Sequence, residues 1–152
     1  MPGTAQFRSS DEIELVVRRF ESCDFAKGEF THAFHLTVAA WYCSRSSPEA
    51  ALERMRAGLV RLTQKFGVKA YHETITRFWI QLVSNRIMME QGKYSLGDSV
   101  NSIISAYASK DIIYEHYSRD LLLSDFAKSH WVEPDLKPMD RSDSGNMYCP
   151  NS

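Results

Sequence analysis

The sequence predicts an all-α fold, a compact single-domain bundle of about six or seven helices. Apolar residues recur at steps of three and four along most of the chain, which is the spacing of one face of an α-helix. Several of these stretches begin with a serine or threonine that can cap a helix, and some end at a glycine. No stretch alternates apolar and polar residues as a half-buried strand does.

The first two helices are predicted on either side of a short connector. The first begins near Ser10, followed by two acidic residues that suit the positive end of the helix dipole. Its apolar positions repeat at helical spacing: Ile13, Val16, Val17 and Phe20. After a connector over residues 24–29, Thr31 is the predicted cap of a second helix that runs to about Cys43.

The third helix has the clearest start in the chain. Ser47 caps it, and Pro48 fits its first turn, where the missing N–H is not needed. Gly67 is its predicted end. One face is apolar and the other faces are basic, as expected of an amphipathic helix at the surface of a core. The apolar positions are Leu52, Met55, Leu59, Leu62 and Phe66.

The fourth helix is predicted over about residues 70–91 and is the longest and most apolar, so we expect it at the centre of the fold. Gly92 is its stop. Ser95 and Asp98 resemble a capping box, with Asp where Glu or Gln is usual, and open a fifth helix that reaches about residue 108.

Shorter elements follow. A short helix is predicted over 111–117, and one or two helical turns over 121–128. Residues 133–138 contain two prolines and are therefore expected to be extended.

The domain limits follow from these elements. Residues 10–138 form the helical domain, 1–9 a flexible lead, and 139–152 a tail that is polar, without periodicity and predicted to be disordered.

Composition narrows the function classes. The 152 residues include 18 basic and 19 acidic ones, for a formal net charge of -1, so no positive field favours nucleic acid. No apolar run approaches the roughly 18 residues that a membrane span needs. The three cysteines form no CxxC pair, and their odd number suits a reducing compartment. We therefore expect a cytoplasmic protein with neither nucleic-acid nor membrane partners.

Histidines are the most informative residues for function. His32 and His35 lie three apart at the start of the second helix, on neighbouring positions of one face. His72 and Glu73 lie at the start of the fourth helix. If these two helix starts meet, imidazoles and a carboxylate converge in an apolar core, which is where a metal site would form.

The resulting hypothesis is a divalent transition metal held by His32, His35 and His72. Glu73 would be a fourth ligand, an orienting partner of a ligand, or the catalytic general base. Three protein ligands leave an open position for a water that the metal acidifies. Zinc would favour a hydrolase, whereas iron held by two histidines and a carboxylate would favour an oxygenase.

Two alternatives keep these residues without a metal. In the first they are structural: His32 caps a helix turn, His35 hydrogen-bonds in the core, and Glu73 pairs with Arg77 four residues on. In the second, His72 and Glu73 form an acid/base pair.

Six motifs add a resemblance. FTHAFHL, AWYC, ALERMRAGL, YHETIT, YSRDLLLS and WVEPDLKP together resemble those of a group of small bacterial helical proteins without an assigned function, over about residues 30–138. The resemblance implies that His32, His35, His72 and Glu73 occupy recurring positions of that group and share a site. His116 falls outside the motifs.

Two function classes therefore stay open. One is a metal-dependent enzyme that acts on a small-molecule substrate. The other is a non-catalytic ligand-binding or regulatory module whose apolar pocket holds a small molecule or a partner helix. Either could bury an aromatic-rich face in a homodimer.

Overall fold

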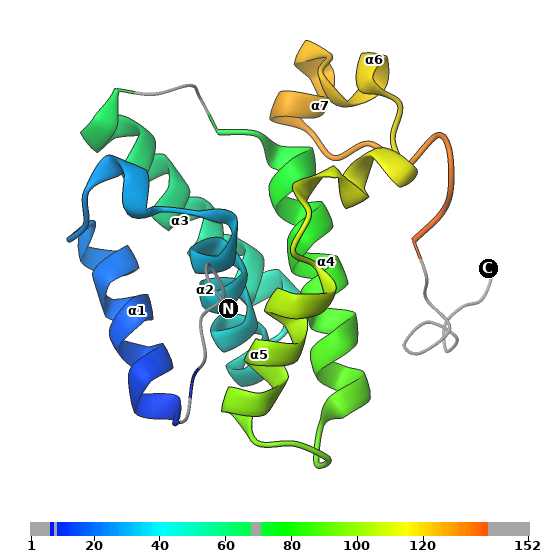
Figure 1. Cartoon of the computed structure of the whole chain (residues 1–152). Helices are drawn as coiled ribbons and strands as arrows, with labels where there is room; N and C mark the ends of the chain where they lie inside the picture. The colour runs from blue at the N-terminus through cyan, green and yellow to red at the C-terminus, as the bar shows by residue number, and fades with distance from the viewer. Residues whose placement is uncertain (1–6, 8, 68–70, 140–152) are drawn as a thin grey trace.

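The computed structural model describes residue 7, residues 9–67 and residues 71–139, and it confirms the all-α class (Figure 1). Strands are absent from these residues. Five longer helices form the body: α1 (Ser10–Ser22), α2 (His32–Arg45), α3 (Pro48–Phe66), α4 (Glu73–Glu90) and α5 (Leu96–Ala106). Short elements complete it: the 3-10 helices η1 (Lys27–Glu29) and η2 (Lys110–Glu115), then α6 (Arg119–Leu122) and α7 (Asp125–Ser129).

The predicted caps explain where the helices begin. The Thr31, Ser47 and Ser95 hydroxyls accept the backbone N–H groups of residues 34, 50 and 98 at 3.1–3.2 Å. Each bond satisfies an N–H that has no partner inside its helix. Gly67 ends α3 with a φ of +63°, a left-handed conformation that glycine adopts without strain. At α1 the cap position is Ser9, one residue before the predicted Ser10.

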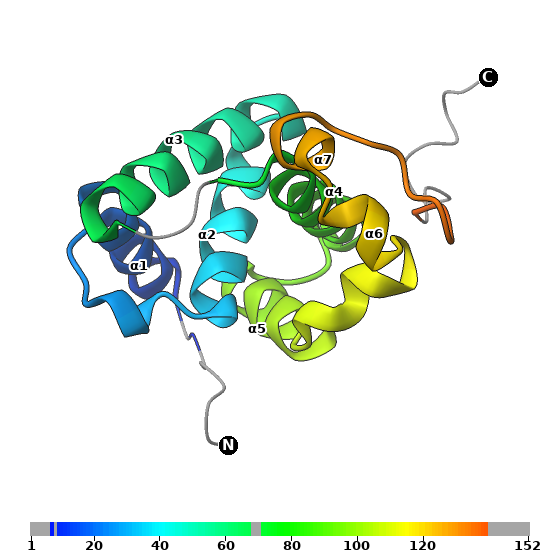
Figure 2. The same ribbon diagram turned by 90° about the horizontal axis from the view of Figure 1, so that it is seen from above.

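Helix α2 occupies the centre of the fold, a position that the sequence predicts for the fourth helix. It packs against α1, α3, α4 and α5, and Figure 2 shows it between them. Residues 36–40 are all buried, so no face of this stretch meets solvent. The prediction for the fourth helix rests on its length and apolar content, but which helix is covered on all sides depends on how the helices pack.

The C-terminal part of the domain folds over the first turns of α4. Helix α7 packs on α4, and the following segment 131–139 is extended, as its prolines predict. Tyr117 contacts this segment through a hydrogen bond that its hydroxyl group donates to the Val132 carbonyl at 2.6 Å. His116 is also buried and bonds through Nδ1 to the Lys137 carbonyl at 2.9 Å.

The domain limits shift slightly in the structure. Met139, the first residue of the predicted tail, is buried in the core, and the rest of that tail lies outside the described residues. Phe7, in the predicted flexible lead, exchanges two backbone hydrogen bonds with the Asn101 side chain at 2.9 and 3.0 Å. Residues 1–6 and 8 of that lead lie outside the described part as well.

Two elements differ from prediction. The short helix expected over 111–117 is the 3-10 helix η2, and α4 begins at Glu73 rather than near residue 70. None of the described helices is both long and apolar enough to cross a membrane.

Candidate functional site

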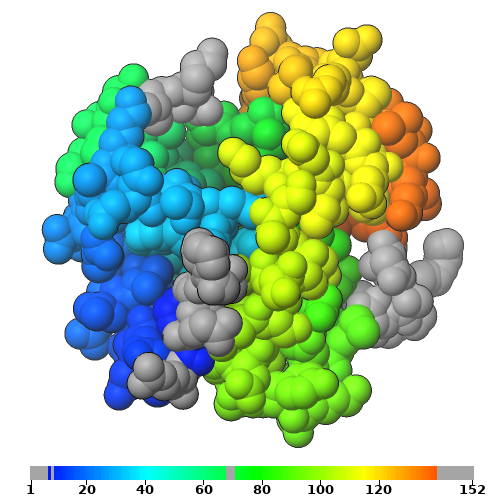
Figure 3. Space-filling model, viewed as in Figure 1, coloured from blue at the N-terminus to red at the C-terminus, as the bar shows by residue number. Residues whose placement is uncertain are grey.

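The structure brings His32 and His35 together. Their ring centroids lie 6.4 Å apart on the first turns of α2. His32 also packs edge-on against Trp79 of α4, and its Nε2 donates to the Tyr107 carbonyl at 2.9 Å. In the space-filling view the N-terminal part of α2 and the segment after α5 adjoin on one face (Figure 3). His32 is therefore anchored at one nitrogen.

His72 lies at the start of α4, one residue before its first turn. It is not on a helix face but is the N-cap of α4, with extended backbone angles. Its Nδ1 accepts the Ile75 N–H at 3.2 Å, and its Nε2 lies 2.7 Å from the Leu122 carbonyl. Because a carbonyl only accepts, Nε2 carries the proton and the ring is neutral. The imidazole performs the capping that Ser or Asp usually performs, and metal binding would cost one of these bonds.

Glu73 is held in a hydrogen-bonded ion pair. Arg56 of α3 donates from Nε and Nη2 to its two carboxylate oxygens at 3.1 and 2.8 Å, and the Tyr71 hydroxyl donates at 2.7 Å. Burial alone would raise the pKa of Glu73, but these donors lower it below its usual value. Arg56, rather than the Arg77 of the structural alternative, is thus its hydrogen-bonded ion-pair partner. Such a carboxylate is a poor proton acceptor at neutral pH.

The four predicted site residues therefore do not meet at one point. Along α4, Glu73 lies six residues before Trp79, the neighbour of His32, which is about 9 Å of helix axis. Across the described ranges, no group of three or more His, Cys, Asp or Glu side chains is placed to hold a metal ion. His32 and His35 do lie side by side, and among the described residues His35 makes ring contacts with His32 and Phe30 but no hydrogen bond.

Burial keeps the clustered histidines neutral. It lowers the pKa of His35 from 6.5 to about 4, with a further contribution from the neighbouring His32. Burial also lowers the pKa values of His32 and His72, although their carbonyl partners oppose the shift. A histidine that resists protonation in the folded chain favours unfolding once the unfolded chain takes up the proton.

Acidification below neutral pH should therefore destabilise the protein. The stability linked to His35 is complete above about pH 6.5 and is lost as the pH falls toward 4. Between pH 7 and 5 this loss amounts to about 2 kcal/mol of unfolding free energy. Urea titrations across that range, followed by circular dichroism, measure it. The variant His35→Gln should flatten the slope, because glutamine does not titrate. Equal slopes for the wild type and His35→Gln would contradict the assignment.

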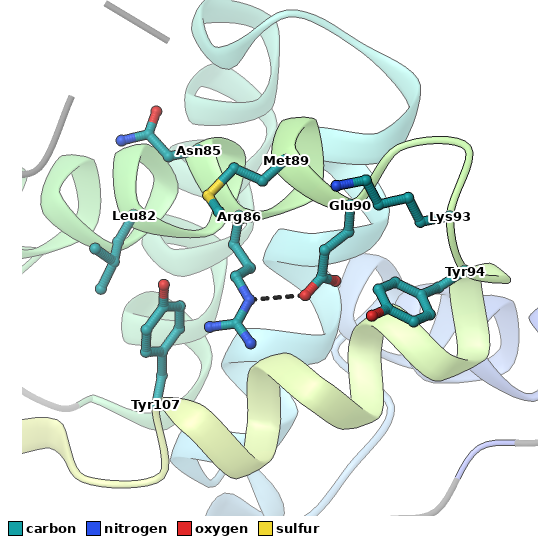
Figure 4. A pocket seen from close by; sticks show the side chains of 8 residues that line it. All are labelled: Leu82, Asn85, Arg86, Met89, Glu90, Lys93, Tyr94 and Tyr107. Carbon is teal, nitrogen blue, oxygen red and sulfur yellow. Dashed lines mark hydrogen bonds and ion pairs between the residues drawn. The ribbon is translucent and has the colours of Figure 1, made fainter. Parts of the chain in front are cut away.

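A pocket of about 390 Å³ lies between the C-terminal half of α4 and α5. Figure 4 shows the side chains that line it. Four of them provide apolar or aromatic surface: Leu82, Met89, Tyr94 and Tyr107. The polar lining consists of Asn85, Arg86, Glu90 and Lys93. This volume lies in the range of about 300–1,000 Å³ that small-molecule sites occupy.

Glu90 is the unusual residue of this pocket. Its side chain is buried, and Oε2 accepts from Arg86 Nε at 2.8 Å. Arg86 Nη2 in turn donates to the Ser102 hydroxyl at 2.9 Å. Oε1 is also buried, yet it has no hydrogen-bond partner in the described part of the chain. An unsatisfied buried acceptor costs about 1–3 kcal/mol, and more when it is charged. A donor brought by a bound molecule would remove this cost.

Sequence reasoning missed this pocket, although one signal was present. Trp79, Val83 and Ile87 mark the buried face of α4, and Glu90 continues it one turn further. A carboxylate on an apolar face indicates a buried charge, which requires a partner. Arg86, four residues earlier, is a partner for one oxygen of the Glu90 carboxylate, and the sequence indicates no partner for the other. Tyr107, from the end of another helix, has no such signal in the sequence.

Comparison with known proteins adds no identification. Searches with this chain match no protein-family model, no curated protein and no solved structure.

Proposed function

We propose that this protein is a ligand-binding module that holds a small organic molecule in the α4–α5 pocket. The observation that carries the proposal is Glu90, a residue of the pocket lining whose buried Oε1 has no hydrogen-bond partner among the described residues. Fold stability alone gives no reason to bury a carboxylate that is only half paired, because this arrangement costs more than a neutral polar residue would. Binding sites commonly combine such a polar group with apolar and aromatic walls.

The construction of the pocket supports binding. Arg86 is fixed at two points, by Glu90 and by Ser102, so the Glu90 carboxylate is oriented before any molecule enters. The rim is more open, since Met89 and Tyr94 are 51% and 58% exposed. An oriented carboxylate beside an exposed apolar rim is therefore prepared to receive a ligand.

The test is a screen of a small-molecule library by two-dimensional amide NMR. Ligands of this pocket should shift the resonances of residues 82–94 and 107 and leave those of α1 unchanged. The variant Glu90→Gln should weaken binding of these ligands, whereas Glu53→Gln, an exposed change on α3, should not. Circular dichroism verifies that both variants are folded. If no compound shifts the pocket resonances, or if both variants bind as the wild type does, the proposal is wrong.

The metal hypothesis stays a second prediction, now centred on His32 and His35. The observation in its favour is that the two rings are neighbours, and that His35 has no hydrogen-bond partner among the described residues. Its low pKa leaves a neutral imidazole at pH 7, which is the form that binds metals. Zinc or iron would then need additional ligands from a substrate or from water. Elemental analysis of protein prepared without a chelator tests it.

A further inference from the structure

The charges around the α4–α5 pocket narrow the chemistry of its ligand. This step rests on the proposed function, because it asks what the pocket binds. The lining has two cations, Arg86 and Lys93, and one carboxylate, Glu90. Arg86 and Glu90 neutralise one another in their ion pair at 2.8 Å. Lys93 has no ion-pair partner among the described residues, so the pocket carries one unbalanced positive charge.

Two polar requirements therefore lie at the same end of the pocket. Glu90 and Lys93 are three residues apart, and the Lys93 N–H donates to the Glu90 carbonyl at 3.0 Å, which closes the end of α4. Figure 4 shows both side chains beside Met89 and Tyr94. Oε1 of Glu90 requires a hydrogen-bond donor, and the Lys93 ammonium favours an anion. A simple anion would satisfy only Lys93, and a simple alcohol only Glu90.

The rest of the lining favours an apolar or aromatic body. Tyr94 and Tyr107 come from opposite ends of the α5 segment, and Leu82 and Met89 line the α4 side. The Arg86 guanidinium lies over the Tyr107 ring at 5.6 Å, which orients that ring from one side. Two aromatic rings and two aliphatic side chains bind flat apolar groups well.

We infer that the pocket binds a small aromatic or apolar carboxylic acid that also carries a hydrogen-bond donor such as a hydroxyl group. The carboxylate pairs with Lys93, and the hydroxyl donates to Glu90 Oε1. The apolar body lies against Tyr94, Tyr107, Leu82 and Met89. No bond is made or broken in this step, so it is recognition and not catalysis.

Three related probes separate the requirements, with amide NMR titrations as the measurement. Phenyllactate has the ring, the carboxylate and the hydroxyl. Phenylpropionate lacks the hydroxyl, and phenylpropanediol replaces the carboxylate with an alcohol. We expect phenyllactate to bind about tenfold more tightly than phenylpropionate, because only phenyllactate can donate a hydrogen bond to the buried charged group. It should bind about fivefold more tightly than the diol, since the Lys93 pair is exposed.

Two variants assign each preference to its residue. Glu90→Gln replaces the charged acceptor with an amide, whose N–H group cannot accept a hydrogen bond and whose oxygen accepts one more weakly. This variant should abolish the preference for phenyllactate over phenylpropionate. Lys93→Met keeps the length of the side chain and should abolish only the preference over the diol. Lys27→Met, an exposed change on η1, is the control for charge alone and should leave both preferences intact.

The outcomes distinguish this inference from the function on which it rests. If phenyllactate binds no better than its two analogues while other compounds occupy the pocket, the ligand class is wrong and the binding function stands. If no compound of any class occupies the pocket, both fail. If Lys93→Met instead lowers Tm by several degrees without ligand, Lys93 is the internal partner of Glu90, and the inference is overturned.

Discussion

Replacing Tyr117 by alanine is expected to lower the free energy of unfolding by about 3–5 kcal/mol, as for other large aromatic residues removed from a core. Tyr117 is completely buried, and its ring packs edge-on against Phe78 and Trp131. It joins the core of α4 to the C-terminal segment, because its hydroxyl donates to the Val132 carbonyl. The loss should therefore release that segment as well as leave a cavity. Urea denaturation followed by circular dichroism measures the change.

The variant Tyr117→Phe separates the ring from the hydroxyl. It keeps the packing and leaves the Val132 carbonyl without its donor, so about 1–2 kcal/mol should be lost. Tyr94→Ala is the matched control, because Tyr94 is 58% exposed and its removal should change stability by less than about 1 kcal/mol. If Tyr117→Ala cost no more than Tyr94→Ala, the ring would not be the anchor that we describe.

Gly58→Ala should destabilise the protein by about 1–3 kcal/mol, although alanine normally favours a helix over glycine by about 1 kcal/mol. Gly58 is buried in α3, and a Cβ built there would lie 2.2 Å from two ring carbons of Phe20 in α1. Phe20 is itself fully buried and stacked on Phe30 at 5.7 Å, so the ring has little room to move away. The Phe20 ring can lie this close to the α3 backbone only at a glycine. Thermal and urea denaturation measure the effect.

A glycine without close neighbours and a smaller side chain at position 20 provide the controls for this prediction. Gly28→Ala adds a Cβ with no atom within 4 Å and should be close to neutral. Combining Gly58→Ala with Phe20→Leu removes the clash, so the double variant should lose less stability than the sum of the single ones. A stabilising effect of Gly58→Ala would mean that α1 and α3 do not touch at this point.

The candidate sites show how far sequence reasoning reaches. His32 and His35 are neighbours in space because they are three residues apart on one helix, and the prediction needed nothing else. Whether His72 and Glu73 join this pair depends on how two helices pack against each other. In the structure His72 caps its own helix and bonds to Leu122, fifty residues away, while Glu73 pairs with Arg56 of α3. Neither partner follows from local spacing.

Local sequence patterns predict the helices and most of their ends. Caps such as Ser47 and stops such as Gly67 act on backbone groups within four residues, so their effect can be read directly from the chain. Tertiary structure alone decided which faces meet: Gly58 against Phe20, Glu73 with Arg56, and Glu90 buried beside a pocket with one oxygen unpaired. Long-range packing sets these contacts, because the free energy of burial depends on the whole core rather than on neighbouring residues.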